Sequence, residues 1–376
     1  MTTRITYGFT NPMPTTTAGP AMVTARDIRG GRIDYASARR TDADAYRERL
    51  TDKSRPRVGD VLLTKDGSIG RVAVCDRPDV CINQSVALLQ VTEEVHSPFL
   101  SYLLQSPKYQ DLLEQGAQGS TIKHIYISRV GDLPINLPPL SEQRAIAEVL
   151  RALDDKSAAN IALAATADQF LAATFQDALD RENTSAGMLD EFDVQFGEPF
   201  SGDQFCSPGS GRPLIRIRDL KTFESQIWTT EQRVRETVIY PGDVLVGMDA
   251  EFRATAWEGR PGLLNQRVCK FSHKSFGNAL IREAIKRPLA EVEAEKSATT
   301  VIHLNKSDLA RKFVAIPTGN AALQFETVAE PLYATRIALA QENRTLAATR
   351  DTLLPQLMSG KLRVRDAEAA ASAAGA

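Results

Sequence analysis

The sequence lacks the long apolar runs of membrane and exported proteins and the excess of basic residues of proteins that bind polyanions over their whole surface. None of its 376 residues falls in an apolar run as long as the roughly 18 residues that span a bilayer. The first residues, MTTRITYGFTNPMPT, lack the apolar core of a signal peptide. We therefore expect a cytoplasmic protein with no membrane partner. The formal net charge of −2 excludes a surface that is basic throughout, although local basic patches can still bind nucleic acid.

Cysteine is also scarce, and its spacing argues against metal sites and disulfides. The four cysteines form no C-x-x-C pair and have no histidine cluster at metal-ligand spacing; they are Cys75, Cys81, Cys206 and Cys269. Reduced structural thiols are expected, with no metal site and no cofactor bound by the chain itself. No catalytic constellation is evident, so no catalytic residue is predicted.

What the chain does have is an internal duplication. Four short strings recur in the same order at an offset of about 180 to 190 residues. The pairs are VTARDI with IRIRDL, VGDVLLTKDG with PGDVLVGMDA, INQSVALL with LNQRVCKF, and more loosely KHIYISRVGDLPINLPP with IHLNKSDLARKFVAIPT. Each pair alone is weak evidence, but four in register predict two related halves.

Each half begins with a pattern of short strands. The string GDVLLTKDGSIGRVAV, residues 59–74, alternates around Asp66 and Gly67, a dipeptide suited to the positive φ angles of a hairpin turn. The glycines at 67 and 70 resemble a phosphate loop only weakly, because the G-K-[ST] ending is absent. A hairpin is the preferred interpretation.

Each half ends in a long helical pattern. After Pro138 and Pro139, Ser141 is a plausible N-cap, and positions spaced alternately by three and four are mostly apolar or small; they are 143, 146, 150, 153, 157, 160, 164, 167, 171, 174 and 178. The second half repeats this spacing from Phe325 to Leu353, through positions 328, 332, 335, 339, 342, 346 and 349. Pro331 is expected to kink this helix or mark its effective start. The pattern predicts an antiparallel coiled coil, although each helix could instead cover only its own domain.

These strings carry a family resemblance. The chain resembles the specificity subunit of type I restriction-modification systems, most specifically in PPLSEQ and LLPQLMSGKL. The resemblance implies an α+β fold with two mixed α/β target recognition domains, each followed by a long helix, related by an internal pseudo-twofold repeat. The implied boundaries are a first recognition domain at 1–137, a central helix serving as spacer at 138–182, a second recognition domain at 183–317, a distal helix at 318–362 and a disordered tail at 363–376. An N-terminal strand of the first domain is expected to be missing or replaced, because that half is shorter before VTARDI.

The resemblance also implies a division of labour. The specificity subunit reads double-stranded DNA, two methyltransferase subunits modify adenine with S-adenosylmethionine, and restriction or motor subunits cleave. The sequence agrees with a non-enzymatic role, since it has no [DN]-P-P-[YF] string and no Walker A loop. The acidic pair in DDK, residues 154–156, is interpreted as a solvated helix face. A protein-interaction scaffold without sequence-specific DNA reading remains the alternative.

Individual contacts follow from residue chemistry. From Arg26 to Arg57 there are ten Arg and Lys against six Asp and Glu, which predicts either a basic surface or merely solvated loops. Side chains able to bind phosphate or base edges are the candidate DNA-binding residues, namely Lys65, Ser68, Ser120, Thr121, Lys123, Arg216, Arg218, Gln266, Arg267 and Thr300. Arg216 and Arg218 are expected on one face of a strand. Candidate partner-docking residues on the helices are Ile146, Leu150, Leu153, Leu339, Leu346 and Leu353.

Overall fold

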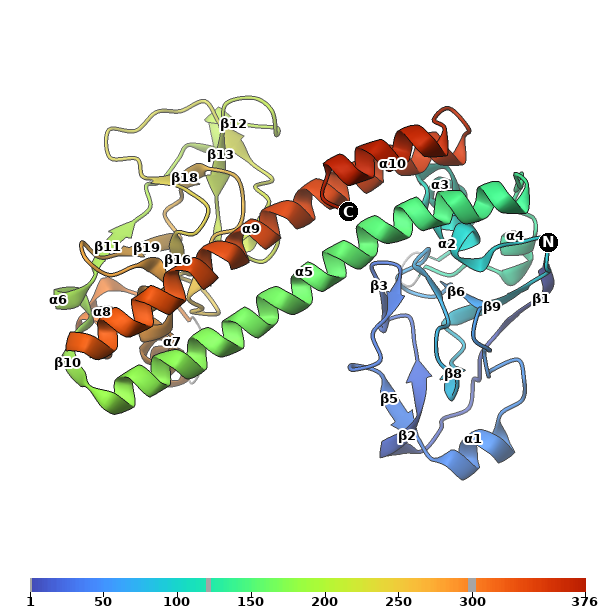
Figure 1. Cartoon of the computed structure of the whole chain (residues 1–376), viewed down its shortest axis with the longest axis horizontal. Coiled ribbons are helices and arrows are strands. Elements are labelled where there is room, and N and C mark those ends of the chain that lie inside the picture. The colour runs from blue at the N-terminus through green and yellow to red at the C-terminus, as the bar shows by residue number, and fades with distance from the viewer. Residues whose placement is uncertain (1, 120–122, 297–301) are drawn as a thin grey trace. The chain divides into compact units, whose positions relative to one another are not determined.

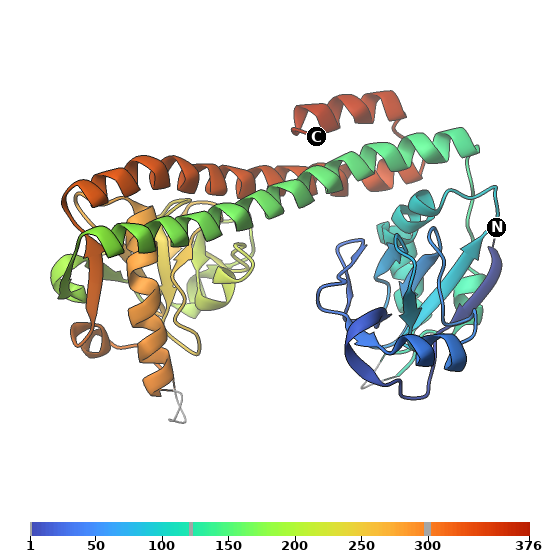
Figure 2. The same ribbon diagram turned by 60° about the horizontal axis from the view of Figure 1, so that its bottom comes forward.

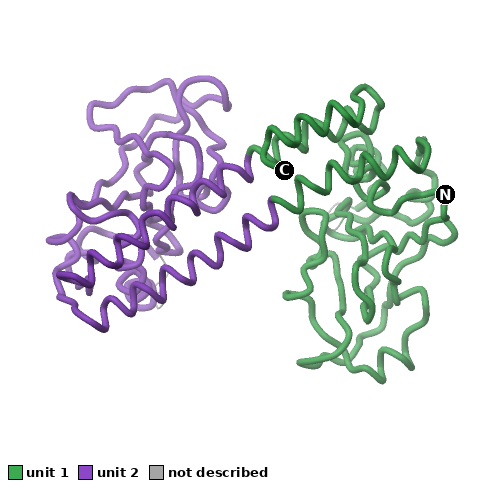
Figure 3. Tube along the Cα trace, in the orientation of Figure 1, with its two compact units in different colours: residues 1–156, 345–376 green, residues 157–344 purple. Residues whose placement is uncertain are grey.

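A computed structural model describes residues 2–119, 123–296 and 302–376 of the chain. The chain divides into two compact units (Figure 3). The first unit comprises Met1–Lys156 and Thr345–Ala376, and the second comprises Ser157–Arg344. Each unit thus contains one group of sheets and short helices together with one part of each long helix. In the described part of the chain, no helix combines the length and apolar character that crossing a membrane requires.

The first unit contains a four-stranded sheet of order β1-β9-β6-β7, packed against short helices. Its strands are β1 (Thr2–Tyr7), β9 (Val86–Val91), β6 (Val61–Thr64) and β7 (Val72–Val74). A second sheet joins β5 (Arg39–Thr41), β2 (Thr15–Val23) and β8 (Val80–Ile82), while β3 (Ile28–Arg29) pairs with β4 (Arg32–Ile33). The helices are α1 (Ala43–Arg49), α2 (Ser97–Gln105), α3 (Pro107–Gln115) and α4 (Ile127–Gly131).

The second unit repeats this plan with additional strands. Its four-stranded sheet has the order β11-β19-β16-β17, formed by β11 (Asp193–Phe196), β19 (Val268–Ser272), β16 (Val244–Gly247) and β17 (Thr255–Ala256). Five strands form another sheet: β12 (Phe205–Cys206), β14 (Trp228–Thr229), β13 (Arg212–Ile215), β18 (Gly262–Leu264) and β15 (Val238–Ile239). The strand β10 (Asn183–Gly187) pairs with β20 (Phe313–Pro317). The helical elements are α6 (Met188–Glu191), η1 (Gly202–Gln204), η2 (Ile217–Leu220), α7 (Asn278–Lys296) and α8 (Lys306–Ala310).

The predicted duplication is confirmed by strand order and pairing. In each four-stranded sheet, the strand that comes first in the chain pairs antiparallel with the strand that comes last, β1 with β9 and β11 with β19. In each unit the other sheet contains one parallel pair, β2 with β8 and β13 with β18. The expectation that an N-terminal strand is missing from the first sheet is wrong, because β1 pairs with β9 as β11 pairs with β19. The shorter first half instead has no counterpart of β10 among its described residues.

Two glycines mark another repeated feature that the string matches did not include. A Cβ on Gly8 would lie 1.8 Å from the carbonyl oxygen of Ile82, and one on Gly197 would lie 2.1 Å from that of Asn265. Both glycines follow the first strand of the four-stranded sheet. Any side chain here would collide with the backbone at Ile82 or Asn265, so each unit requires glycine at this place.

The predicted hairpin is present, with a longer connection than a two-residue turn. The strands β6 and β7 are antiparallel, with Val61 opposite Val74 and Leu63 opposite Val72. Gly67 has a φ of 74°, in the region that favours glycine. The connection spans residues 65–71, and Asp66 forms a β-bridge with His124 rather than with β7. The loop therefore faces a segment from much later in the chain.

The central helix, α5 (Leu140–Arg181), buries the predicted seam. Every seam position from 143 to 178 is buried or half-buried, which confirms the spacing. The predicted N-cap is wrong, however, because Ser141 lies inside the helix. The carbonyl of Pro139 accepts from the backbone N–H groups of Glu142 and Gln143, at 2.9 and 3.0 Å.

The distal helix, α9 (Gly319–Met358), follows its predicted seam only in part. Val328 is 45% exposed, whereas Tyr333 and Ile337, off the predicted seam, are buried. The reason is that this part of α9 packs on the core of the second unit, where the Tyr333 hydroxyl donates to the carbonyl of Gly242 at 2.8 Å. The helix begins well before Pro331 and ends just before Gly360, whose φ is 70°.

The two helices pair in opposite directions within each unit, as predicted. In the first unit Asp154 of α5 lies 3.0 Å from Arg350 of α9. In the second, Asn160 lies 3.0 Å from Asn343, and Arg181 lies 3.1 Å from Gln324. Partner numbers on α9 fall as those on α5 rise, and both views show the 157–181 and 319–344 segments side by side (Figure 1 and Figure 2).

Two expectations about the helices and the tail need correction. Five of the six candidate docking residues are buried in the core of the first unit, namely Ile146, Leu150, Leu153, Leu346 and Leu353, and Leu339 is half-buried. They pack within the chain, so a partner cannot reach them while the helices stay paired. The tail is also not disordered, because α10 (Val364–Ala373) buries Ala367 and Ala371 in the same core. Its alanines favour helix and present a small apolar face.

Candidate nucleic-acid interface

An aspartate and a histidine meet at the same place in both units. Asp66 follows β6 and binds Nδ1 of His124, and Asp249 follows β16 with its Oδ1 at 2.6 Å from Nδ1 of His303. Backbone bonds reinforce each pair, from Ile125 to the Lys65 carbonyl at 2.9 Å and from Leu304 to the Met248 carbonyl at 2.8 Å. In each unit, therefore, a late segment is fixed to the end of a central strand.

A cation lies beside each pair, but the two cations differ in exposure. Lys65 Nζ is 3.1 Å from Asp66, and its side chain is only 6% exposed. Arg267 Nη1 is 3.5 Å from Asp249, with half of its side chain exposed. Lys65 also lies 5.2 Å from the centre of the Tyr7 ring. Lys65 thus mainly neutralises Asp66, which corrects its assignment as a DNA contact. Arg267 Nη1 also lies 3.1 Å from Nδ1 of His303, but half of the Arg267 side chain stays exposed.

The other candidates in the first unit gather around this pair. Ser68 is exposed in the connection after β6, and the carbonyl of Lys123 accepts from Gly67 at 2.9 Å. The Lys123 ammonium binds the exposed carboxylate of Glu114, and this hydrogen bond lowers the pKa of Glu114. Ser120 and Thr121 lie outside the described residues. Ser68 and Lys123 are therefore the described candidates that the fold brings together.

In the second unit the expected strand placement of the paired arginines is wrong. β13 ends at Ile215, and Arg216 instead precedes the short helix η2. Its guanidinium Nε is 3.2 Å from Asp219, which also accepts from the Arg216 backbone N–H. Thr24 and Asp27 make the corresponding bond in the first unit, at 2.7 Å. Arg216 is thus held in a turn that both units contain. In each unit the aspartate of the R-D string closes this turn by accepting a backbone N–H.

Arg218, Gln266 and Arg267 remain exposed in the second unit. Gln266 donates its backbone N–H to the carbonyl of Glu198 at 3.1 Å, and the residue is exposed. Thr300 lies outside the described residues. Sequence reasoning missed the role of Asp66 and Asp249, although both occupy the same place in the aligned strings VGDVLLTKDG and PGDVLVGMDA.

The basic segment from Arg26 to Arg57 is partly neutralised. Arg32 lies 2.5 Å from Asp155, and Arg55 lies 3.0 Å from Asp52. Arg47 pairs with Asp44 on the same helix. Since such exposed pairs contribute little to stability and hold charge locally, the solvated-loop interpretation accounts for much of this segment.

Comparisons with known proteins agree with one another. Residues 15–165 match a family described as the type I restriction modification DNA specificity domain. The type I restriction enzyme EcoBI specificity subunit of Escherichia coli is 30% identical over 176 residues, 45% of this chain and 37% of that protein. The type I restriction enzyme MjaIX specificity subunit of Methanocaldococcus jannaschii is 23% identical over 340 residues, 82% and 78% of the two chains.

A solved structure matches the fold. The crystal structure of a type I restriction-modification S subunit from M. genitalium has a TM-score of 0.63 with 17% identity, covering 94% of this chain and 93% of that one. At this identity the likeness bears on the fold alone. The match to the E. coli subunit covers little more than a third of that protein.

Proposed function

We propose that this chain, a relative of the specificity subunits of type I restriction enzymes that carries their DNA specificity domain over residues 15–165, is the DNA-reading subunit of a type I restriction-modification complex. It is not itself an enzyme. The observation that carries the proposal is the duplicated Asp–His pair with exposed polar and basic side chains beside it. Two copies of one framework with different flanking residues suit a protein that reads two different short sequences.

Each unit reads one half of a bipartite target. In the first, Ser68 and Lys123 face the DNA, and in the second Arg218, Gln266 and Arg267 do so. A lysine supplies phosphate contacts, whereas arginine and glutamine can also bind guanine or adenine edges in the major groove. Because these exposed residues differ between the units, the target is asymmetric.

The long helices dock two methyltransferase subunits, which bind S-adenosylmethionine and methylate adenine, and restriction or motor subunits join the same complex. Exposed apolar side chains on α5 support a docking role. Leu163 and Phe170 are 52% exposed and lie seven residues apart, and hence on one face of the helix. We take this shared face as the docking surface, because grouped exposed apolar side chains mark interaction sites.

The competing function is an interaction scaffold that keeps the architecture without reading sequence. An electrophoretic shift assay with the matching methyltransferase subunit separates the two. For a DNA reader, a duplex carrying the methylated target of that system competes far better than a scrambled duplex of equal length. Equal competition by both duplexes would support the scaffold instead.

A further inference from the structure

A pocket in the second unit shares only Arg218 with the residues proposed to read duplex DNA. It lies between η2, the end of β16, β17, α7 and α9 and has a volume of about 890 Å³. Its apolar lining includes Ile217, Phe223 and Ala256. A volume of this order and an apolar wall with a few polar groups are typical of small-ligand sites.

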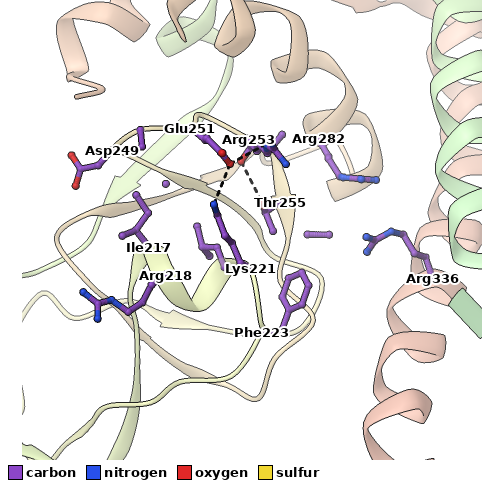
Figure 4. A pocket seen from close by; sticks show the side chains of 15 residues that line it. Ile217, Arg218, Lys221, Phe223, Asp249, Glu251, Arg253, Thr255, Arg282 and Arg336 are labelled. Carbon is purple, nitrogen blue, oxygen red and sulfur yellow. Dashed lines mark hydrogen bonds and ion pairs between the residues drawn. The ribbon is translucent and has the colours of Figure 1, made fainter. Parts of the chain in front are cut away.

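Two arginines form one side of the pocket (Figure 4). Arg282 is only 8% exposed, and its Nε is buried without a hydrogen-bond partner among the described residues. Its Nη1 lies 2.6 Å from Asp168, and Nε of Arg336 lies 2.9 Å from the same carboxylate. Burial works against the charge on Asp168, but the two arginines outweigh it and lower its pKa. Asp168 thus holds both guanidinium groups, which keep positive charge along this side of the pocket.

The rim of the pocket carries further cations. Arg218 is exposed and has no ion pair in the described part of the chain, while Lys221 and Arg253 share Glu251 at 3.5 and 3.3 Å. Asp249 also lines the rim but is engaged by His303. Arginine and lysine therefore outnumber carboxylates here, which favours an anionic group at the mouth.

The backbone around the pocket is held in an uncommon conformation. Phe223 has a φ of 58° and Ala250 has a φ of 67°. Both line the pocket, and left-handed backbone is costly for residues other than glycine. The Phe223 ring packs edge-on against Trp257, with centroids 5.8 Å apart, which fixes an aromatic wall.

A cleft in the first unit provides an internal comparison. It lies between comparable elements, with Val74 from β7, Ser101 from α2 and Arg151 from α5 in its lining. Three aspartates and three arginines balance each other in this lining, namely Asp76, Asp154, Asp155, Arg32, Arg77 and Arg151. Ser101 is the fifth residue of α2, as Arg282 is of α7. The first unit therefore lacks the deep arginine that the second offers.

We infer that the pocket of the second unit binds one nucleoside phosphate, with the phosphate at Arg218 and Arg253 and the planar base against Ile217 and Phe223. The ligand has two possible sources, a free nucleotide or a single nucleotide displaced from a DNA strand. The first unit is not expected to bind it, so one site per chain follows.

Calorimetric titration of the full chain with adenosine 5′-monophosphate tests this inference. One site per chain is expected, with adenosine and ribose 5-phosphate each binding at least about tenfold more weakly, since each lacks one half of the contacts. Arg218→Ala and Arg253→Ala, both at exposed positions that spare the core, should each weaken binding about tenfold, the worth of one charge-assisted hydrogen bond. Arg235→Ala, at an exposed position in the same unit outside the pocket, should leave binding unchanged.

A second measurement distinguishes the two possible sources of the ligand. Binding of a short single-stranded oligonucleotide is measured with the same variants and in competition with the mononucleotide. Mononucleotide binding that is sensitive to Arg218→Ala supports a free nucleotide, and oligonucleotide binding alone with that sensitivity supports a strand nucleotide. No binding of either, or binding that Arg218→Ala and Arg253→Ala leave unchanged, would overturn the inference. The mononucleotide arm contains no DNA, so its outcome is independent of duplex reading.

Discussion

Asn160 of α5 donates its side-chain amide to Glu342 of α9, with 2.6 Å between Nδ2 and Oε2. Asn160 is only 3% exposed, and the same nitrogen lies 3.0 Å from Asn343 Oδ1. A polar side chain in a mostly apolar seam fits best in one alignment of the two helices, because shifting the register would bury the amide without partners. The pair therefore specifies the register of α5 against α9.

Replacement of Asn160 tests this role in stability. Asn160→Ala removes the amide and leaves a small void in the seam, so the free energy of unfolding is expected to fall by about 1–3 kcal/mol. Urea unfolding followed by circular dichroism measures the change. Thr166→Ala is the matched control on the same helix, since Thr166 is exposed and its hydroxyl donates to the carbonyl of Ala162 in the preceding turn. Equal effects of the two changes would exclude a special role for Asn160.

Gln143 offers an independent test at the start of α5. It is 1% exposed, accepts from the backbone N–H of His96 at 2.9 Å and donates to the carbonyls of Glu94 and Pro138. Gln143→Ala leaves these backbone groups without their partner and should cost about 1–3 kcal/mol of unfolding free energy. Gln176→Ala, at an exposed site on the same helix, should cost much less. A Gln143→Ala variant with an unchanged free energy of unfolding would show that these three hydrogen bonds are dispensable.

The thiols should differ sharply in reactivity. Burial raises the pKa of Cys75 to about 11 and that of Cys81 and Cys269 to about 12. Thiolate is the reactive form, so at pH 8 these three thiols are expected to stay unmodified in the folded chain. Cys206 is partly exposed. Titration with Ellman's reagent should detect one thiol before unfolding and four after, and Cys206→Ser should abolish the early signal. Rapid modification of further thiols would contradict the buried assignments.

Arg267 is the exposed cation beside the second Asp–His pair, so its loss should weaken DNA binding. If Arg267 contacts phosphate, Arg267→Ala reduces the slope of log affinity against log salt by about one. If it reads a base, the variant instead tolerates substitutions at one position, with a loss of about 1–3 kcal/mol for the cognate base. Lys274→Ala, at another exposed position in the unit, is the control. Affinity and slope are measured on the complex with its methyltransferase subunit, and no difference between the two variants would exclude Arg267 from the interface.

The sequence predicted the duplicated framework and the first seam well, because both depend on local patterns. The strings VGDVLLTKDG and PGDVLVGMDA contain equivalent strands, β6 and β16, in the two units. The apolar positions predicted for the seam of α5 are buried or half-buried, as expected. The seam of α9 was misplaced because Tyr333 and Ile337 pack on the domain core, a contact that helix spacing alone does not reveal. The roles of Lys65 and Arg216 were missed for a similar reason. Each is held by an adjacent or nearby aspartate, and side-chain burial is decided by the fold.

The central claim is that each half of the chain reads its own part of a bipartite target. The most direct test exchanges residues 1–137 for the equivalent region of a relative with a known target, and maps methylated adenines genome-wide in cells that also express the methyltransferase subunit. The junction lies just before α5, so both long helices are kept. One half-site should change to that of the relative while the other half-site stays the same. A change in both half-sites, or in neither, would contradict the account.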